Sequence, residues 1–190
     1  MNPAIVIIME QLEQRTTLQP LSPLYSWDEQ LETKIESLKQ EATSTPMITL
    51  IAALHLRNDS LALSHSYAQQ IEHDPTGAYW HGIMHRMDGD YWNANYWFRQ
   101  AGNHPVMTKI KPIVAQWLQQ NWHSKLADSA SAHILESFKL NNAWNSMQFT
   151  DLVQTCLRSN DAILEELLKH IQAIEIKALF QHTLNALAKS

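Results

Sequence analysis

Helix-breaking residues are rare in this chain, and their positions divide it into segments of helical length. The 190 residues include only four Gly and seven Pro, fewer than the roughly 7% and 5% of an average protein. Between them, apolar residues recur every three or four positions, the spacing that gives a helix one buried face. The pattern predicts an all-α protein of about seven to nine helices.

Length, charge and cysteine content narrow the class of protein. A chain of 21.9 kDa with 45% hydrophobic and 17% charged residues is expected to form one globular domain over residues 1–190. No apolar run approaches the roughly 20 residues that span a membrane. The net charge is −5, and the 14 Lys and Arg are scattered singly, which argues against nucleic acid as a partner. The single Cys156 lies in an apolar sequence, which fits a reducing cytoplasm.

The domain divides into stretches of different pattern. Residues 1–25 form an N-terminal segment, a short apolar run followed by an irregular, proline-containing connection. Residues 46–105 form two helical hairpins, in which Pro75 is predicted to end one helix and the next to begin at Tyr79. A further helix is expected beyond Pro112, and a short helix flanked by loops within 125–146. Residues 161–189 form a C-terminal helix with one continuous apolar face, long enough to brace the domain.

The second of these hairpins resembles a tetratricopeptide repeat. Gly82, Ala94, Phe98 and Ala101 stand at the small and aromatic positions that characterise the repeat. The first hairpin carries small residues less regularly, and Ala52 precedes Gly82 by 30 residues, whereas the repeat has a period of about 34. The resemblance implies two closely packed hairpins rather than a regular solenoid.

Two histidines and a carboxylate share one side of the helix that contains Gly82. His81, His85 and Asp88 follow one another at i, i+4 and i+7. Side chains one turn apart converge on a single ion, so the spacing predicts a divalent metal site. His65 on the preceding helix is a further candidate ligand, and either His65 or His104 is a candidate fourth ligand or general base. In the structural alternative, the histidines hydrogen-bond across the hairpin and hold no ion.

A longer motif around these residues resembles the signature of an uncharacterised family of mostly bacterial and fungal proteins. The motif reads Tyr79-Trp80-His81-Gly82-Ile83-Met84-His85-Arg86, then Asn93-Ala94-Asn95-Tyr96-Trp97-Phe98-Arg99, then Gly102-Asn103-His104-Pro105. Gln100 stands where the family has a second arginine. The family has no assigned activity, but the resemblance implies that the polar and aromatic residues of the motif form one connected constellation.

Three hypotheses for the function follow. An aromatic, His- and Arg-lined site on the second hairpin predicts a binding protein for a protein, a peptide or a small anionic ligand. The alternative is a metal-dependent hydrolase or oxygenase that uses His81, His85 and Asp88. A scaffold whose motif only maintains the fold is the third reading. The sequence leaves the oligomeric state open and implies no cofactor other than a divalent metal. The candidate ligand-binding residues are Trp80, His81, His85, Arg86, Asn93, Tyr96, Trp97, Arg99 and His104.

Overall fold

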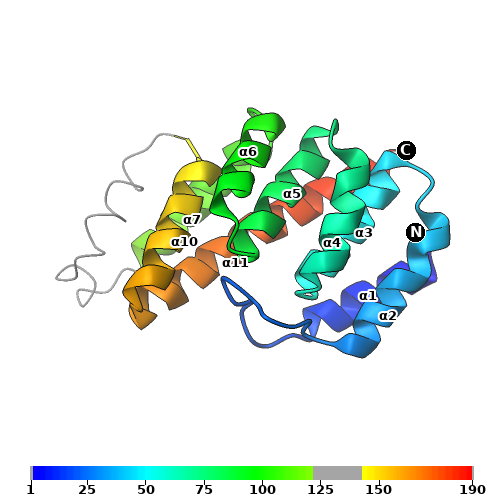
Figure 1. Cartoon of the computed structure of the whole chain (residues 1–190), viewed down its shortest axis with the longest axis horizontal. Helices are drawn as coiled ribbons and strands as arrows, with labels where there is room; N and C mark the ends of the chain where they lie inside the picture. The colour runs from blue at the N-terminus through cyan, green and yellow to red at the C-terminus, as the bar shows by residue number, and fades with distance from the viewer. Residues whose placement is uncertain (1, 122–142, 190) are drawn as a thin grey trace.

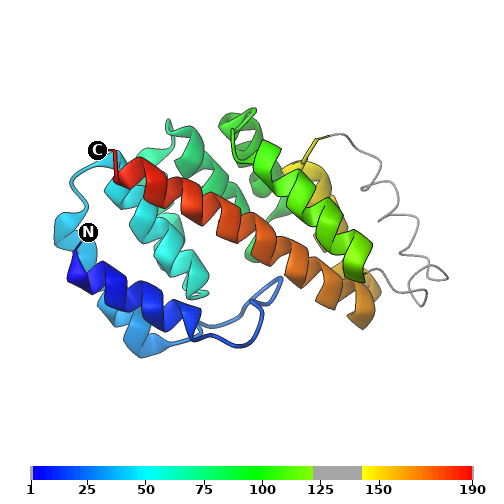
Figure 2. The same ribbon diagram turned by 180° about the vertical axis from the view of Figure 1, so that it is seen from behind.

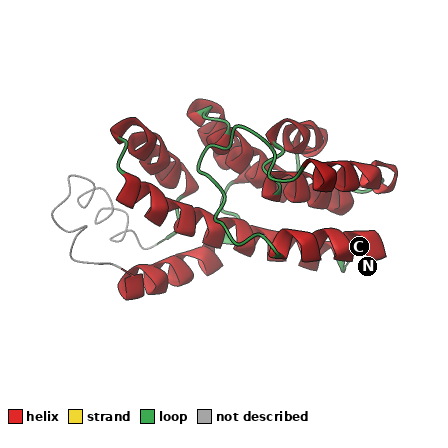
Figure 3. Cartoon of the chain, turned by 90° about the horizontal axis from the view of Figure 1, so that it is seen from below, coloured by secondary structure: helices red, strands yellow, loops and turns green. Residues whose placement is uncertain are grey.

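The computed structural model describes residues 2–121 and 143–189, and these residues fold into helices and loops without any strand (Figures 1 and 3). This confirms the predicted all-α class. None of the described helices is long and apolar enough to cross a membrane. The short helix expected within 125–146 falls largely outside the described residues. The described part contains nine α-helices: α1 (Pro3–Glu13), α2 (Glu29–Glu36), α3 (Thr45–Arg57), α4 (Leu61–Ala68), α5 (Pro75–Met87), α6 (Tyr91–Ala101), α7 (Met107–Asn121), α10 (Ser146–Ser159) and α11 (Ala162–Leu187).

Helix α5 begins four residues before its predicted start. The Asp74 side chain accepts a hydrogen bond from the Gly77 amide at 2.8 Å and caps the helix. Pro75 occupies the first turn, where the missing amide hydrogen would have had no partner within the helix. The proline therefore starts α5. The preceding helix α4 ends earlier, at Ala68, and continues as a short 3-10 turn over Gln69–Ile71.

Helix α7 also begins before the predicted point and contains Pro112 in its interior. A proline inside a helix removes one backbone hydrogen bond and disfavours the turn before it. Here Ile110, Val114 and Leu118 are all buried on one face of the helix. Burial of this face on both sides of Pro112 outweighs the lost hydrogen bond, so the proline does not mark a helix start.

The helices pack as consecutive hairpins braced by α11. Helices α3 and α4 form one hairpin and α5 and α6 the next, with α4 against α5. Helix α11 runs behind them and contacts α3, α7 and α10 (Figures 1 and 2). Helices α1 and α2 pack together at the end near α3. The predicted long C-terminal helix is confirmed as this brace.

Small residues let the two helices of each hairpin approach closely. In the first hairpin, the Ser64 hydroxyl donates to the Ala52 carbonyl at 2.9 Å. In the second, a Cβ added to Gly82 would lie 2.7 Å from Cε1 of the Phe98 ring. Phe98 is itself buried in the core. Position 82 therefore has no room for a larger residue unless the Phe98 ring moves.

The Gly82→Ala variant tests this close contact. We expect the free energy of unfolding to fall by about 1–3 kcal/mol, because overpacking a well-packed core forces side chains from their preferred positions. Urea unfolding followed by circular dichroism measures the change. Adding Phe98→Leu, which shortens the clashing side chain, is expected to make the Gly82→Ala change less costly than it is in the parent. Equal costs in the two backgrounds would contradict the contact.

Candidate metal-binding site

Three histidines meet where α4 packs against α5. His65 comes from α4, and His81 and His85 lie one turn apart on α5. One ring nitrogen from each residue lies within 4.8 Å of the others. The ring centroids of the three pairs are 4.8 to 5.1 Å apart, with His81 and His85 stacked and His65 edge-on to both. We call these residues the histidine triad.

The most buried member of the triad lacks hydrogen-bond partners. His81 is 1% exposed, and neither of its ring nitrogens makes a hydrogen bond. The Nδ1 atom of His85 is also buried without one. A buried polar atom without a partner costs about 1–3 kcal/mol, and native proteins usually satisfy such atoms with water or an ion. A water molecule or an ion that binds these nitrogens would therefore be favourable.

Aromatic side chains from α6 form one wall of the triad. The Trp97 indole stacks on the His81 ring, with 4.1 Å between centroids. The Tyr96 ring packs edge-on against Trp97. This wall keeps water from one side of His81 and fixes the plane of its ring. The motif residues His81, His85, Tyr96 and Trp97 are thus brought together.

Burial favours the neutral form of the His81 and His85 imidazoles. It lowers the pKa of His81 to about 3, and the neighbouring His85 and His65 rings disfavour its protonation further. Burial also lowers the pKa of His85, followed by the effect of His65, while Asp90 and Asp88 act in the opposite direction. Neutral imidazole is the form that ligates metal. At neutral pH, an ion would not have to displace protons from His81 or His85.

The triad is wider than an occupied zinc site. Zinc–nitrogen bonds of about 2.0–2.1 Å in a tetrahedral site place the nitrogens about 3.3 Å apart, whereas the triad spans up to 4.8 Å. His65 and His85 are half-buried, so their rings have room to turn inward. Three histidines leave a fourth position open for water or another ligand.

The other metal candidates from the sequence lie outside the triad. Asp88 is exposed and stands at the C-terminal end of α5. The residue that joins His81 and His85 in the cluster is His65 and not Asp88. His104 accepts a hydrogen bond from the Val106 amide at Nδ1, and its Nε2 lies 3.2 Å from the Thr76 hydroxyl. Both His104 nitrogens are therefore engaged elsewhere.

The remaining candidates of the second hairpin do not share one surface. Trp80 is fully buried and donates to the Thr183 hydroxyl. Arg86 is also fully buried, whereas Arg99 is exposed. Asn93 donates its side-chain amide to Asp90 at the start of α6. The motif thus divides into the triad with its aromatic wall, a set of core residues and exposed positions.

The core residues of the motif belong to a buried polar network that includes α11. Arg86 donates to Glu175 at 2.5 Å, and the Tyr79 hydroxyl donates to the same carboxylate at 2.9 Å. The Trp144 indole donates to Ser146 at 2.9 Å, and the Tyr79 hydroxyl lies 2.6 Å from the Ser146 hydroxyl. Sequence reasoning missed Glu175. Its signal was a carboxylate four residues after Ile171 and four before Leu179, on the apolar face of α11.

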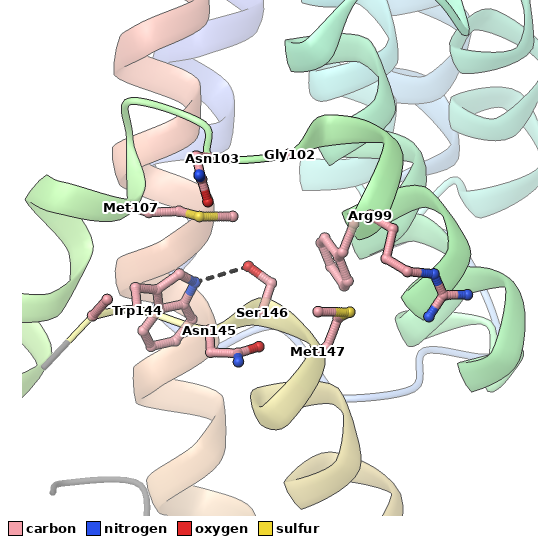
Figure 4. Close-up of a pocket in the computed structure, with 10 residues that line it drawn as sticks. Arg99, Gly102, Asn103, Met107, Trp144, Asn145, Ser146 and Met147 are labelled. Atoms are coloured by element: carbon pink, nitrogen blue, oxygen red, sulfur yellow. Dashed lines mark hydrogen bonds between the residues drawn. The ribbon is translucent and has the colours of Figure 1, made fainter. Parts of the chain in front are cut away.

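A cavity of about 550 Å³ lies beside this network (Figure 4). The Phe98 side chain and Gly102 of the second hairpin line one side, and Trp144 and Ser146 line the other. Figure 4 shows Trp144 and Ser146 facing the cavity and the Arg99 guanidinium directed away from them.

Comparison of the chain with protein-family models, with curated proteins and with solved structures finds no match.

Proposed function

We propose that this protein binds a divalent transition-metal ion through the histidine triad. The observation that supports it best is the convergence of three ring nitrogens within 4.8 Å around a buried His81 whose nitrogens have no hydrogen-bond partner. Imidazole suits zinc, copper, nickel and iron. Asp90 Oδ2 lies 4.0 Å from His85 Nδ1, and a carboxylate behind a ligating histidine is how proteins commonly orient it. An enzymatic role would use the open fourth position.

Metal content and affinity test the proposal directly. Tag-free protein purified without chelator is expected to carry about one ion per chain by elemental analysis, or to take up one Zn²⁺ in calorimetric titration. His81→Ala should weaken binding by more than the roughly 10- to 100-fold typical of losing an outer-shell partner. His73, exposed in the turn between α4 and α5, provides the control His73→Ala. Equal affinity in both variants, or no binding by the parent, would refute the proposal.

The Asp90→Asn variant tests whether the Asp90 carboxylate orients His85, because it removes the charge but keeps a capping residue at the start of α6. Asp90 caps α6 by accepting from the Asn93 amide, and asparagine is an equally good cap. We expect the variant to lose at most about 1 kcal/mol of unfolding free energy, from the charge at the start of α6 and the hydrogen bond from the Asn93 side chain, and to lose about tenfold in Zn²⁺ affinity. Calorimetric titration and urea unfolding measure the two quantities. An unchanged affinity would show that Asp90 does not orient a ligand.

The cavity beside α6 supports a second candidate, the binding of a small anionic ligand on the second hairpin. Its volume of about 550 Å³ lies within the range of small-molecule sites. Arg99 is the cation at its edge, and its guanidinium, which Figure 4 shows directed away from Trp144 and Ser146, would turn toward a bound anion. A thermal-shift screen of small carboxylic and phosphoric acids is expected to find a ligand that Arg99→Gln weakens and the exposed control Arg158→Gln does not. Failure of every acid, or equal effects of the two variants, would reject this candidate.

A further inference from the structure

A second, more apolar cavity lies between α1, the segment that follows it and the C-terminal half of α11. None of the triad residues lines it. Figure 2 shows α1 and α11 on the same face of the molecule. The cavity has a volume of about 660 Å³, within the range of sites for small molecules. Its apolar lining comes from Val6, Met9, Leu12, Ile176, Phe180 and Leu184.

One cation in this wall has an unused donor. The Arg57 guanidinium lies over the Phe180 ring, with Cζ 4.3 Å from its centroid. Its Nη2 pairs with the exposed Glu13 carboxylate at 2.6 Å, but its Nη1 is buried without a hydrogen-bond partner. The other arginine of the lining, Arg15, is already paired with Asp59 at 2.8 Å. Arg57 is therefore a cation of this lining with a buried donor that lacks an acceptor.

We propose that this cavity binds a fatty acid, with its carboxylate on Arg57 and its acyl chain against the apolar lining. An apolar wall with a single unsatisfied guanidinium nitrogen matches a ligand that has one anionic end and an apolar body. Charge-assisted hydrogen bonds from arginine to carboxylate are strong and directional. Lys177, exposed at the same cavity, adds positive charge. Glu10 and Glu13 also line it but are exposed, where solvent screens their repulsion.

Titration calorimetry with dodecanoate, below its micellar concentration and with a chelator present, tests the proposal. We expect saturable binding of one molecule per chain. Decanoate should bind more weakly, since each buried methylene contributes about fourfold in affinity. Dodecanol, which has the same chain without the charge, should bind at least tenfold more weakly than dodecanoate. No saturable binding, or equal affinity for the acid and the alcohol, would overturn the proposal.

Two variants locate the ligand within the chain. Arg57→Gln is expected to weaken dodecanoate binding at least tenfold, whereas Arg158→Gln, at an exposed arginine of α10, should leave it unchanged. Because Arg57 also contacts Glu13 and Phe180, Val6→Asp serves as a second variant. Val6 is 37% exposed, so the change is compatible with folding, and its charge should expel the acyl chain. Affinity unchanged in both folded variants would place any bound acid elsewhere and overturn the proposal.

Discussion

Glu175→Gln is expected to lower the free energy of unfolding by about 3–5 kcal/mol, the cost of removing one partner of a buried ion pair. Both Arg86 and Glu175 have fully buried side chains. The Arg86 guanidinium also faces the Phe149 ring at 4.6 Å, but Glu175 provides its negative charge. Urea unfolding measures the loss. The matched control is Glu165→Gln, at a partly exposed residue of the same helix that pairs with Lys169, where the loss should stay below about 1 kcal/mol.

The double variant Arg86→Met with Glu175→Leu separates burial of charge from loss of packing. Replacing a whole buried ion pair by apolar residues of similar volume is often neutral or stabilising. The double variant should therefore be more stable than Glu175→Gln alone. If it is less stable, the hydrogen bonds that Tyr79 and Trp144 make to Glu175 dominate the energetics of this network.

Acid is expected to unfold the metal-free protein well above the pH at which most carboxylates protonate. Burial lowers the pKa of His55 and of His104 from 6.5 to about 4, and that of His81 to about 3. Between pH 6.5 and 4, the unfolded chain binds protons at these residues that the folded chain does not bind. Stability therefore rises with pH in this window and is lost as the pH falls.

The size of this acid effect follows from the number of histidines. Each adds up to about 1.4 kcal/mol per pH unit, so these three give a slope of up to about 4 kcal/mol per pH unit, to which His85, whose pKa burial also lowers, adds in the same direction. Urea unfolding at several pH values, with chelator present, measures the slope. His55→Gln should reduce it by up to one such contribution, whereas the exposed control His73→Gln should not. A stability that is constant from pH 7 to 5 would contradict the prediction.

The all-α class and the approximate positions of the helices were predictable, because both follow from the spacing of apolar residues and from the positions of helix-breaking residues. Helix α6 spans Tyr91–Ala101 because two local signals bound it: Asp90 caps its start, and Gly102, with φ of 61°, ends it. The start of α5 was not predictable with the rule that Pro75 ends a helix, since proline fits a first turn equally well. The outcome depended on Asp74, which caps α5.

The candidate site was only partly predictable, because its third ligand comes from another helix. The i, i+4 spacing of His81 and His85 places both on one face, and the structure sets the two rings 4.8 Å apart. Extending that face by one turn suggested Asp88, but α5 ends at Met87 and leaves Asp88 exposed. His65, the other candidate ligand named from the sequence, lies beside them because α4 packs on α5, and spacing within one helix could not choose between His65 and Asp88. No sequence pattern indicated the apolar cavity that Arg57 lines, because its lining comes from three segments that are distant in sequence.

The late position of Glu175 in the chain, on α11, affects when the core around Arg86 can fold during synthesis. Arg86 and Glu175 are 89 residues apart, so at about 5–20 residues per second the ribosome adds the carboxylate about 5–20 s after the arginine. During that interval the guanidinium has no anion to accompany it into the core, and desolvating it alone is costly. The hairpin that carries His81 and His85 therefore reaches its final packing only after the first half of α11 has been synthesised.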